Sequence, residues 1–415
     1  MPHLFQKPTA MNLLACRSRL ARHAAWMLAV LAFAVAVLLA PLASAVGIPG
    51  DTEDSPETLY QRGLATFTSG DYEHSLEFLD ALIKVFGEEP ELQQRIDLAM
   101  YARACALYNL QRYPEAIEAF NKYATKFPSS KFVDEAYFRI ASSHQLNDNL
   151  GSAVTAYETL RSRFPASAYA EDALYQIGIC HLLQEHSADA TVAFQQFLAE
   201  YPKSRMAPQA GAYAARSLFD DGESEKAIDM LQQVEAMSNR TWAVITYCNF
   251  LAFEIGDYVF DDTEYELALR AYRRVKPRAA ILRHLQEDVA ALERALARVQ
   301  SERIMPGTMS EHYRTERRLA SILGQNKEML QKLTSAPDYD SNLYHRIGRC
   351  FFNTDRFWEA RVAFARVVAT ASDPDVKEAA HFDLILSISR LRRFSDLLVE
   401  ADDYLATYDS EGHWQ

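Results

Sequence analysis

The sequence predicts an all-α solenoid of stacked helical hairpins, interrupted by one long helix. Three segments between Leu98 and Arg205 align with one another at a step of 37 residues, which places Pro128, Pro165 and Pro202 in register. A fixed step of this size is typical of repeat arrays in which each unit packs on its neighbours. The chain has only 14 glycines in 415 residues, 49% of its residues are apolar, and alternating β-type runs are scarce. This composition favours helices over strands.

Small and large residues recur with the same step. Each segment has a small residue in its first half, another in its second half, and a large aromatic residue four positions later. These are Ala104, Ala141 and Gly178, then Ala116, Ala153 and Ala190, then Phe120, Tyr157 and Phe194. Two helices approach to about 8 to 10 Å where small side chains allow it, and a large residue then fills the groove. The proline after each second helix stops that helix.

Residues 1–45 have the pattern of a secretory signal peptide. Arg17, Arg19 and Arg22 precede an apolar run over 26–39, and small residues at 43–45 resemble a cleavage site. The run is shorter than the roughly 20 residues that a membrane-spanning helix needs. We therefore expect cleavage after Ala45, and an uncleaved membrane anchor is the alternative.

Residues 46–56 are expected to form a flexible leader, because they are rich in acidic and turn-forming residues. Residues 57–237 are then expected to form the N-terminal repeat array. It begins with a degenerate unit marked by Gly63 and Leu79, continues through the three regular units, and ends with a unit marked by Ala215 and Ala227.

Residues 238–304 are expected to contain an irregular repeat and a long helix. A helix over 242–254 precedes an insertion, GDYVFDDTEYE, and a second short helix. Six apolar residues then recur at alternating spacings of three and four: Leu282, Leu285, Val289, Leu292, Leu296 and Val299. This heptad seam is shorter than three heptads, so two interpretations stay open. The long helix either packs along the array or forms the seam of a homodimer.

Residues 305–415 are expected to form C-terminal repeats of the same type. Met305-Pro306-Gly307 breaks the long helix and marks a hinge or domain boundary. Residues 309–333 are predicted to form an irregular helical pair, after which Gly348 and Phe364 mark a regular unit and a last unit follows.

Charge and motifs exclude several functional classes. Residues 1–45 hold four basic and no acidic residues, so the remaining 39 basic and 56 acidic residues give a net charge of −17. Such a surface disfavours nucleic acid. The sharp motifs of hydrolases, nucleotide-binding enzymes and metalloenzymes are absent from the sequence, which predicts no enzyme activity, metal site or cofactor. We interpret His144 and His181 as packed, hydrogen-bonded core residues.

Aromatic residues recur along one face of the first helices. Tyr101, Phe138 and Tyr175 occupy one equivalent position, and Tyr108 and Leu182 belong to a second position on the same face. Exposed in a row, they would form a concave groove for an extended or helical segment of a protein partner. Partial burial between neighbouring repeats is the alternative.

Two charge clusters follow one another near the insertion. Asp257, Asp261, Asp262, Glu264 and Glu266 lack the spacing of a calcium loop and favour a solvated acidic loop. A basic patch then follows, formed by Arg270, Arg273, Arg274, Lys276 and Arg278. It either neutralises the acidic loop or binds an anionic partner.

By its marker positions the chain resembles the tetratricopeptide repeat family over most of Glu57 to Asp409. Its F/Y-P-x-S junctions, at 127–130, 164–167 and 201–204, look like those of two bacterial envelope members. These are the periplasmic coordinator of the Tol-Pal system and the outer-membrane lipoprotein that helps assemble β-barrels. The chain lacks the coiled coil of the first, the lipidated cysteine of the second and the carboxylate clamp of the family.

The resemblance implies a noncatalytic adaptor that is exported to the periplasm or the outer membrane. Its expected partners are other envelope proteins or peptides, and it would meet a membrane only through an uncleaved signal or through a partner. The alternative is a structural, oligomeric envelope component that dimerises through the 282–299 seam.

Overall fold

The computed structural model describes residues 55–301 and 309–408, and the side chains of all of these except 309–311. Within these ranges the chain folds into helices and contains no strand. This confirms the predicted all-α class. The expected signal peptide, nearly all of the leader and the break at 305–307 lie outside the described residues. Among the helices that are described, none combines the length and the apolar character that crossing a membrane would require.

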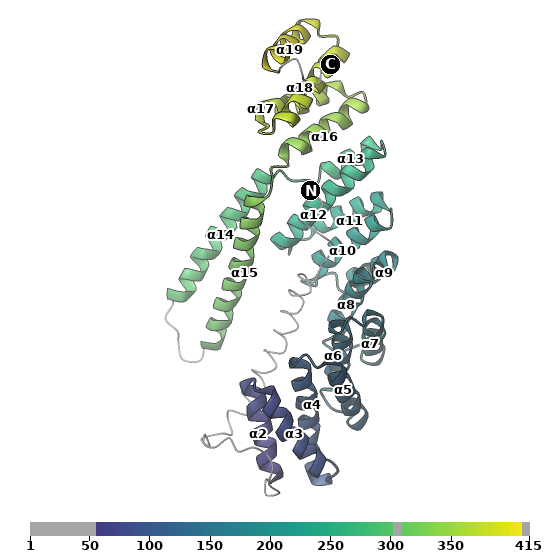
Figure 1. The fold of residues 1–415 in the computed structure, drawn as a ribbon, viewed down its shortest axis with the longest axis vertical. Coiled ribbons are helices and arrows are strands. Elements are labelled where there is room, and N and C mark those ends of the chain that lie inside the picture. Colours follow the sequence, from purple (N-terminus) through teal and green to yellow (C-terminus); the bar gives the residue numbers. More distant parts are fainter. Residues whose placement is uncertain (1–54, 302–308, 409–415) are drawn as a thin grey trace. The chain divides into compact units, whose positions relative to one another are not determined.

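The chain divides into two compact units, residues 1–210 and 211–415. The first unit is a run of helical hairpins in which each helix packs on the next (Figure 1). Its helices are α2 (Pro56–Ser69), α3 (Tyr72–Phe86), the 3₁₀ turn η1 (Pro90–Leu92), α4 (Gln93–Asn109), α5 (Tyr113–Lys126), α6 (Val133–Leu146), α7 (Leu150–Arg163), α8 (Ala170–Leu183) and α9 (Ser187–Glu200). The boundary between the units falls within α10 (Ala207–Asp220).

The second unit combines hairpins of the same kind with one long helical hairpin. Its helices are α11 (Ser224–Ala236), α12 (Trp242–Asp261), α13 (Tyr265–Tyr272), α14 (Arg278–Ser301), α15 (Met309–Ser335), α16 (Asp340–Asn353), α17 (Phe357–Thr370), α18 (Pro374–Arg390) and α19 (Phe394–Thr407). The predicted divisions at 237/238 and 304/305, which concern repeat type, stay predictions.

Each regular hairpin is closed by a large side chain that packs on a small residue. A Cβ atom placed on Gly178 would lie 2.6 Å from the ring of Phe194, and Gly348 stands in the same relation to Phe364, at 2.5 Å. Both aromatic side chains are fully buried. The predicted register of small and large residues is therefore confirmed in these hairpins, and glycine is what allows the ring to reach the helix backbone.

The junction between repeats is held by a recurring hydrogen bond. The Ser130 hydroxyl donates to Asp97 at 3.0 Å, and the Ser167 hydroxyl donates to Asp134 at 2.7 Å. The same serine oxygen accepts from the backbone N–H two residues further on, at 3.1 Å for Ser167. This short polar turn directs the chain into the next first helix, which explains the serine of the F/Y-P-x-S junctions.

The turn inside each hairpin also repeats. Gln111, Asp148 and Glu185 all adopt a left-handed conformation, with φ of 63°, 61° and 62°. Because these turns are equivalent, the residues that flank them occupy equivalent places in successive repeats.

The structure corrects two helix boundaries that the sequence suggested. Helix α12 continues to Asp261, so the first part of the expected insertion is helical. Residues 309–333 lie in the single helix α15 and do not form a helical pair.

The heptad seam has its main partner within the same long hairpin. Leu285 and Val289 of α14 are buried in one cluster with Leu323 and Leu333 of α15, and helices α14 and α15 lie side by side (Figure 1). The apolar residues that pack at the edge of this cluster include Leu282, Leu292 and Leu296 of the seam and Trp242 and Phe250 of α12.

This arrangement bears on both interpretations of the seam. Leu285 and Val289 are buried against α15, so the seam has a partner within the chain, and a homodimer through the seam stays a prediction. Packing along the array is confirmed only where α14 meets Trp242 and Phe250 of α12. The sequence did not indicate α15 as the partner of the seam.

Candidate functional site

The predicted aromatic groove residues are buried. Tyr101, Phe138 and Tyr175 are 4%, 5% and 4% exposed, Tyr108 is 9% exposed, and Leu182 is half-buried. The expectation of an exposed groove is therefore wrong for the four aromatic side chains, and burial between neighbouring repeats is what the structure shows.

The physical reason lies at the repeat junctions. The ring of Tyr101 stacks on Phe132, with centroids 4.7 Å apart, and the ring of Phe138 stacks on Tyr169 at 5.1 Å. Phe132 and Tyr169 precede the next first helix, so each junction covers the aromatic residue of the repeat before it. Offset stacking of this kind adds to the apolar burial.

A buried ion pair also fills this face. The Arg139 guanidinium lies 2.9 Å from the Glu135 carboxylate on α6, and both side chains are nearly inaccessible. Arg139 also lies over the ring of Tyr108, 5.1 Å from its centroid. Burial raises the pKa of Tyr101, and the negative charge of Glu135 raises it further. The interior of this region is thus polar but paired, and it presents no open site.

Two residues of the basic patch are paired with acidic side chains, which do not belong to the acidic cluster. Arg270 pairs with Glu225 and Asp229 on α11, at 2.6 and 2.8 Å. Arg274 pairs with Glu235 on the same helix, at 2.8 Å. The Arg278 side chain donates to the backbone carbonyls of residues 333 and 334. Arg273 and Lys276 are exposed. Helix α11, and not the acidic loop, therefore neutralises Arg270 and Arg274, and an anionic partner for the rest of the patch stays a prediction.

Two residues of the acidic cluster make contacts within the fold. Asp257 accepts a hydrogen bond from the Tyr272 hydroxyl at 2.6 Å, and its carboxylate lies 3.5 Å from Arg346. Asp261 lies 3.7 Å from the same guanidinium. Both aspartates belong to α12 and not to a loop, whereas Asp262 and Glu264 are exposed in the turn between α12 and α13, as expected of a solvated acidic loop.

Two histidines of the regular repeats are half-buried and lack a hydrogen bond on one nitrogen. The Nδ1 atoms of His144 and His181 are buried without a partner. Burial lowers the pKa of both imidazoles. The predicted packing in the repeat is confirmed, whereas the predicted hydrogen bond is absent at Nδ1.

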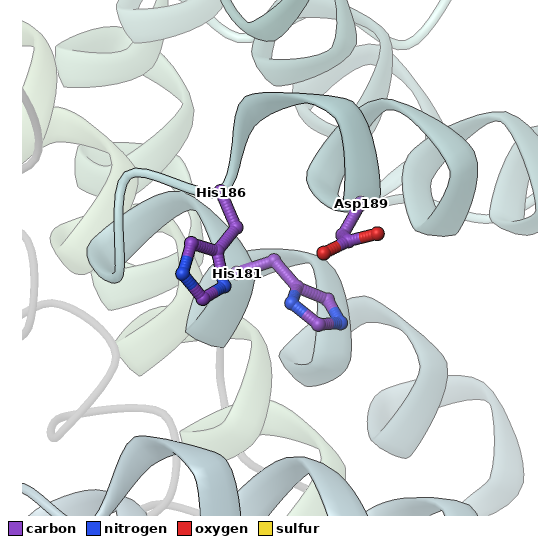
Figure 2. Close-up of side chains that lie close together, drawn as sticks. All are labelled: His181, His186 and Asp189. Carbon is purple, nitrogen blue, oxygen red and sulfur yellow. The ribbon is translucent and has the colours of Figure 1, made fainter.

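His181 lies in a cluster with two other chemically active side chains. His186 and Asp189 come from the start of α9, and one donor atom from each of the three residues lies within 4.8 Å of the other two. Figure 2 shows the two imidazole rings next to each other, with the Asp189 carboxylate directed toward His181. The ring centroids are 6.3 Å apart.

A second cluster of this kind joins α18 and α19. The buried His381 Nε2 atom lies 3.3 Å from the Glu400 carboxylate and 4.0 Å from that of Asp403. The Nε2 atom of His381 makes no hydrogen bond, although the Glu400 carboxylate is its nearest acidic group.

An apolar groove lies between α3, α4 and α5, with a volume of about 750 Å³. Ile83, Met100 and Ile117 contribute apolar surface to it. The charged residues at its edge are already paired, Lys126 with Glu88 at 2.8 Å for example.

Large apolar side chains are exposed on α17 and α19. They are Trp358 and Val362 on α17, and Phe394, Leu398, Val399 and Leu405 on α19. Helix α19 buries only Tyr404. Exposed apolar surface of this kind marks binding sites in soluble proteins.

Parts of the chain match two family models. Residues 52–173 match the family described as an outer membrane lipoprotein (YfiO), and residues 172–204 match the tetratricopeptide repeat. No curated protein matches the chain.

Solved structures with similar helical repeats include three from bacteria. A tetratricopeptide repeat protein from Parabacteroides merdae is 15% identical, with 80% of this chain and 98% of that chain covered and a TM-score of 0.37. The C-terminal part of a TPR repeat-containing protein from Cytophaga hutchinsonii is 11% identical, with 77% and 98% covered and a TM-score of 0.43. MamA from Desulfovibrio magneticus RS-1 is 17% identical, with 45% and 96% covered and a TM-score of 0.35.

The sequence matches and the hairpin geometry agree on the type of protein. The chain is an all-α protein that resembles the tetratricopeptide repeat family, and its residues 52–173 are similar to the outer membrane lipoprotein family.

Proposed function

We propose that the chain is a noncatalytic scaffold that is exported to the bacterial cell envelope and binds other envelope proteins. The stacked hairpins support the binding role, since repeat arrays present long surfaces to partners. The signal-like residues 1–45 support export. The similarity of residues 52–173 to an outer membrane lipoprotein family supports a periplasmic place, at or near the outer membrane.

The proposal depends on the outer face of α19, the exposed face that includes Leu398 and Leu405. Helices α17 and α19 are equivalent at a step of 37 residues, so Leu398 corresponds to Arg361 and Leu405 to Val368. Arg361 contacts the following hairpin through Asp396, at 3.5 Å, and Val368 packs in the cluster that α17 forms with α18. Leu398 and Leu405 occupy the same stacking positions, yet they are 67% and 58% exposed.

The repeat itself indicates what fits this face. On α17 the equivalent surface is covered by α18, a helix that presents Ala380, Leu384 and Ile388. The occupant of the α19 face is therefore an amphipathic helix from a protein partner. The acidic side chains of Asp402 and Asp403 are exposed on α19, so the polar face of that helix is basic.

Photo-crosslinking at single positions tests this proposal. A photoreactive amino acid at Leu398 or Leu405, in the chain expressed in its own cells, is expected to yield an adduct with one envelope protein. The matched control is Val192, which is 64% exposed on α9 and lies outside the exposed apolar set of α17 and α19. The purified partner should then bind the wild-type chain, and the Leu398→Glu and Leu405→Glu double variant should lose at least about 1.4 kcal/mol of binding free energy, a tenfold change.

Three outcomes would contradict the proposal. Equal crosslinking at Val192 would mean that the α19 face is not the binding surface. An adduct with a second copy of this chain would assign the face to self-assembly. Retention of residues 1–45 on a cytoplasmic chain, shown by mass spectrometry of cell fractions, would remove the envelope role.

A further inference from the structure

His181, His186 and Asp189 bring three metal-binding groups together at the turn between α8 and α9. His181 belongs to the last turn of α8, His186 immediately precedes α9, and Asp189 lies in the first turn of α9. The buried Nδ1 atom of His181 has no hydrogen-bond partner. We propose that these three side chains bind a divalent transition-metal ion of the zinc type.

The chemistry of the donors selects this class of ion. Two imidazole nitrogens and one carboxylate oxygen suit zinc and its neighbours, whereas calcium and magnesium prefer oxygen ligands alone. Bonds of about 2.0 to 2.2 Å to a tetrahedral ion place the donors about 3.4 Å from one another. The three donor atoms already lie within 4.8 Å of one another, and rotation of the exposed His186 and Asp189 side chains would close the remaining distance.

The unsatisfied nitrogen of His181 favours metal binding. A neutral imidazole presents a lone pair, which is the form that binds a metal ion. An ion bound at Nδ1 would supply the partner that this buried atom lacks.

The preceding repeat shows that the fold does not require this cluster. His144 is equivalent to His181, and its Nδ1 atom is buried without a partner in the same way. The positions that correspond to His186 and Asp189 are Asn149 and Ser152, which do not complete a metal-binding set. The two hairpins have the same turn, so this turn does not depend on the donors at 186 and 189.

Three protein donors leave one position open on a tetrahedral ion. That position would hold water or a donor from a bound protein, as in zinc sites that exchange a ligand. The ion would also tie the end of α8 to the start of α9, and so stabilise this hairpin against opening.

A zinc titration of the full chain, without an added polyhistidine tag, tests the proposal. Calorimetry is expected to show that the variant with His186→Asn and Asp189→Ser binds one zinc ion fewer than the wild-type chain. Both substitutions copy the preceding repeat at exposed positions, so the fold is expected to be unchanged in circular dichroism. If residual binding persists, its affinity should fall by at least about 10-fold.

The reverse variant, Asn149→His with Ser152→Asp, should gain one zinc site beside His144. The Asp403→Asn variant tests the second cluster on its own, because it should leave zinc binding at His186 and Asp189 unchanged. Zinc should also raise the melting temperature of the wild-type chain more than that of the variant at 186 and 189.

Several results would overturn the proposal. One is that the variant with His186→Asn and Asp189→Ser binds zinc with the stoichiometry and affinity of the wild-type chain. The others are that the wild-type chain binds only at millimolar zinc, or that it binds calcium as tightly as zinc. A reverse variant that gains no site would show that the three side chains are insufficient.

Discussion

The contact between Gly178 and Phe194 yields the sharpest stability prediction. Phe194 is fully buried, and the substitution Phe194→Ala should lower the free energy of unfolding by about 3 to 5 kcal/mol. An added methyl group at Gly178 would lie 2.6 to 2.8 Å from three atoms of the Phe194 ring. Overpacking of this kind costs about 1 to 3 kcal/mol, whereas the change from glycine to alanine in a helix gains about 1 kcal/mol. Gly178→Ala alone should therefore cost about 0 to 2 kcal/mol.

The sign of the effect should reverse when the ring is removed. In the Phe194→Ala background the methyl group has space, so Gly178→Ala should stabilise the chain by about 1 kcal/mol. The interaction energy of the double-mutant cycle is then about 1 to 3 kcal/mol. Gly324 is the matched control, since nothing lies within 4 Å of a Cβ at that position in α15. Gly324→Ala should stabilise the chain in either background.

Urea unfolding followed by circular dichroism measures these differences, and hydrogen exchange in α8 and α9 assigns them to the hairpin. If Gly178→Ala stabilises the wild-type chain as much as Gly324→Ala does, the ring does not pack against the helix backbone. A loss below about 1 kcal/mol for Phe194→Ala would refute the register of the repeats in the same way.

Three further predictions concern buried charge, pH and backbone strain. Arg139→Met leaves Glu135 buried without a partner and should cost about 3 to 5 kcal/mol in urea unfolding, most of which a second substitution, Glu135→Leu, should restore. Burial lowers the pKa of His144 and His181, so their contribution to stability is complete above the ordinary value of about 6.5 and is lost as the pH falls through the lowered folded pKa. A chain with glutamine at both positions should lose less stability on acidification than wild type in pH-dependent melting, and parallel curves would contradict this. Thr263 has a φ of 66°, so Thr263→Gly should stabilise the chain by about 1 kcal/mol, and a lower melting temperature would argue against strain there.

The hairpin register could be predicted from the sequence because it depends on residues that are close together in the chain. Pro128 and Pro165 follow α5 and α7 as the repeat pattern requires, and the small residues meet the large ones that follow. These features recur at a fixed step, so each repeat supports the assignment of the others. Burial of Tyr101 could not be derived in this way, because it depends on Phe132, a junction residue outside the marker pattern.

The metal-binding candidate was missed for a related reason. His181 belongs to α8 and His186 immediately precedes α9, so the turn between the two helices decides whether their rings meet. The left-handed residue in this turn, Glu185, is neither glycine nor asparagine, so the sequence does not reveal its conformation. Comparison with His144 and Asn149 one repeat earlier is the signal that would have distinguished an extra donor from a packing residue.

The seam on α14 and the outer face of α19 show what an apolar pattern can establish. Both patterns indicate that a helix needs a partner, and neither identifies it. On α14 the main partner is α15, since Leu285 is fully buried in the cluster that holds Leu323. Among the described residues, nothing covers the corresponding apolar face of α19. Leu398 and Leu405 are exposed there, whereas the equivalent face of α17 is covered. We therefore place the binding surface on α19, whose apolar side chains are exposed, and not on the seam, whose central side chains are buried against α15.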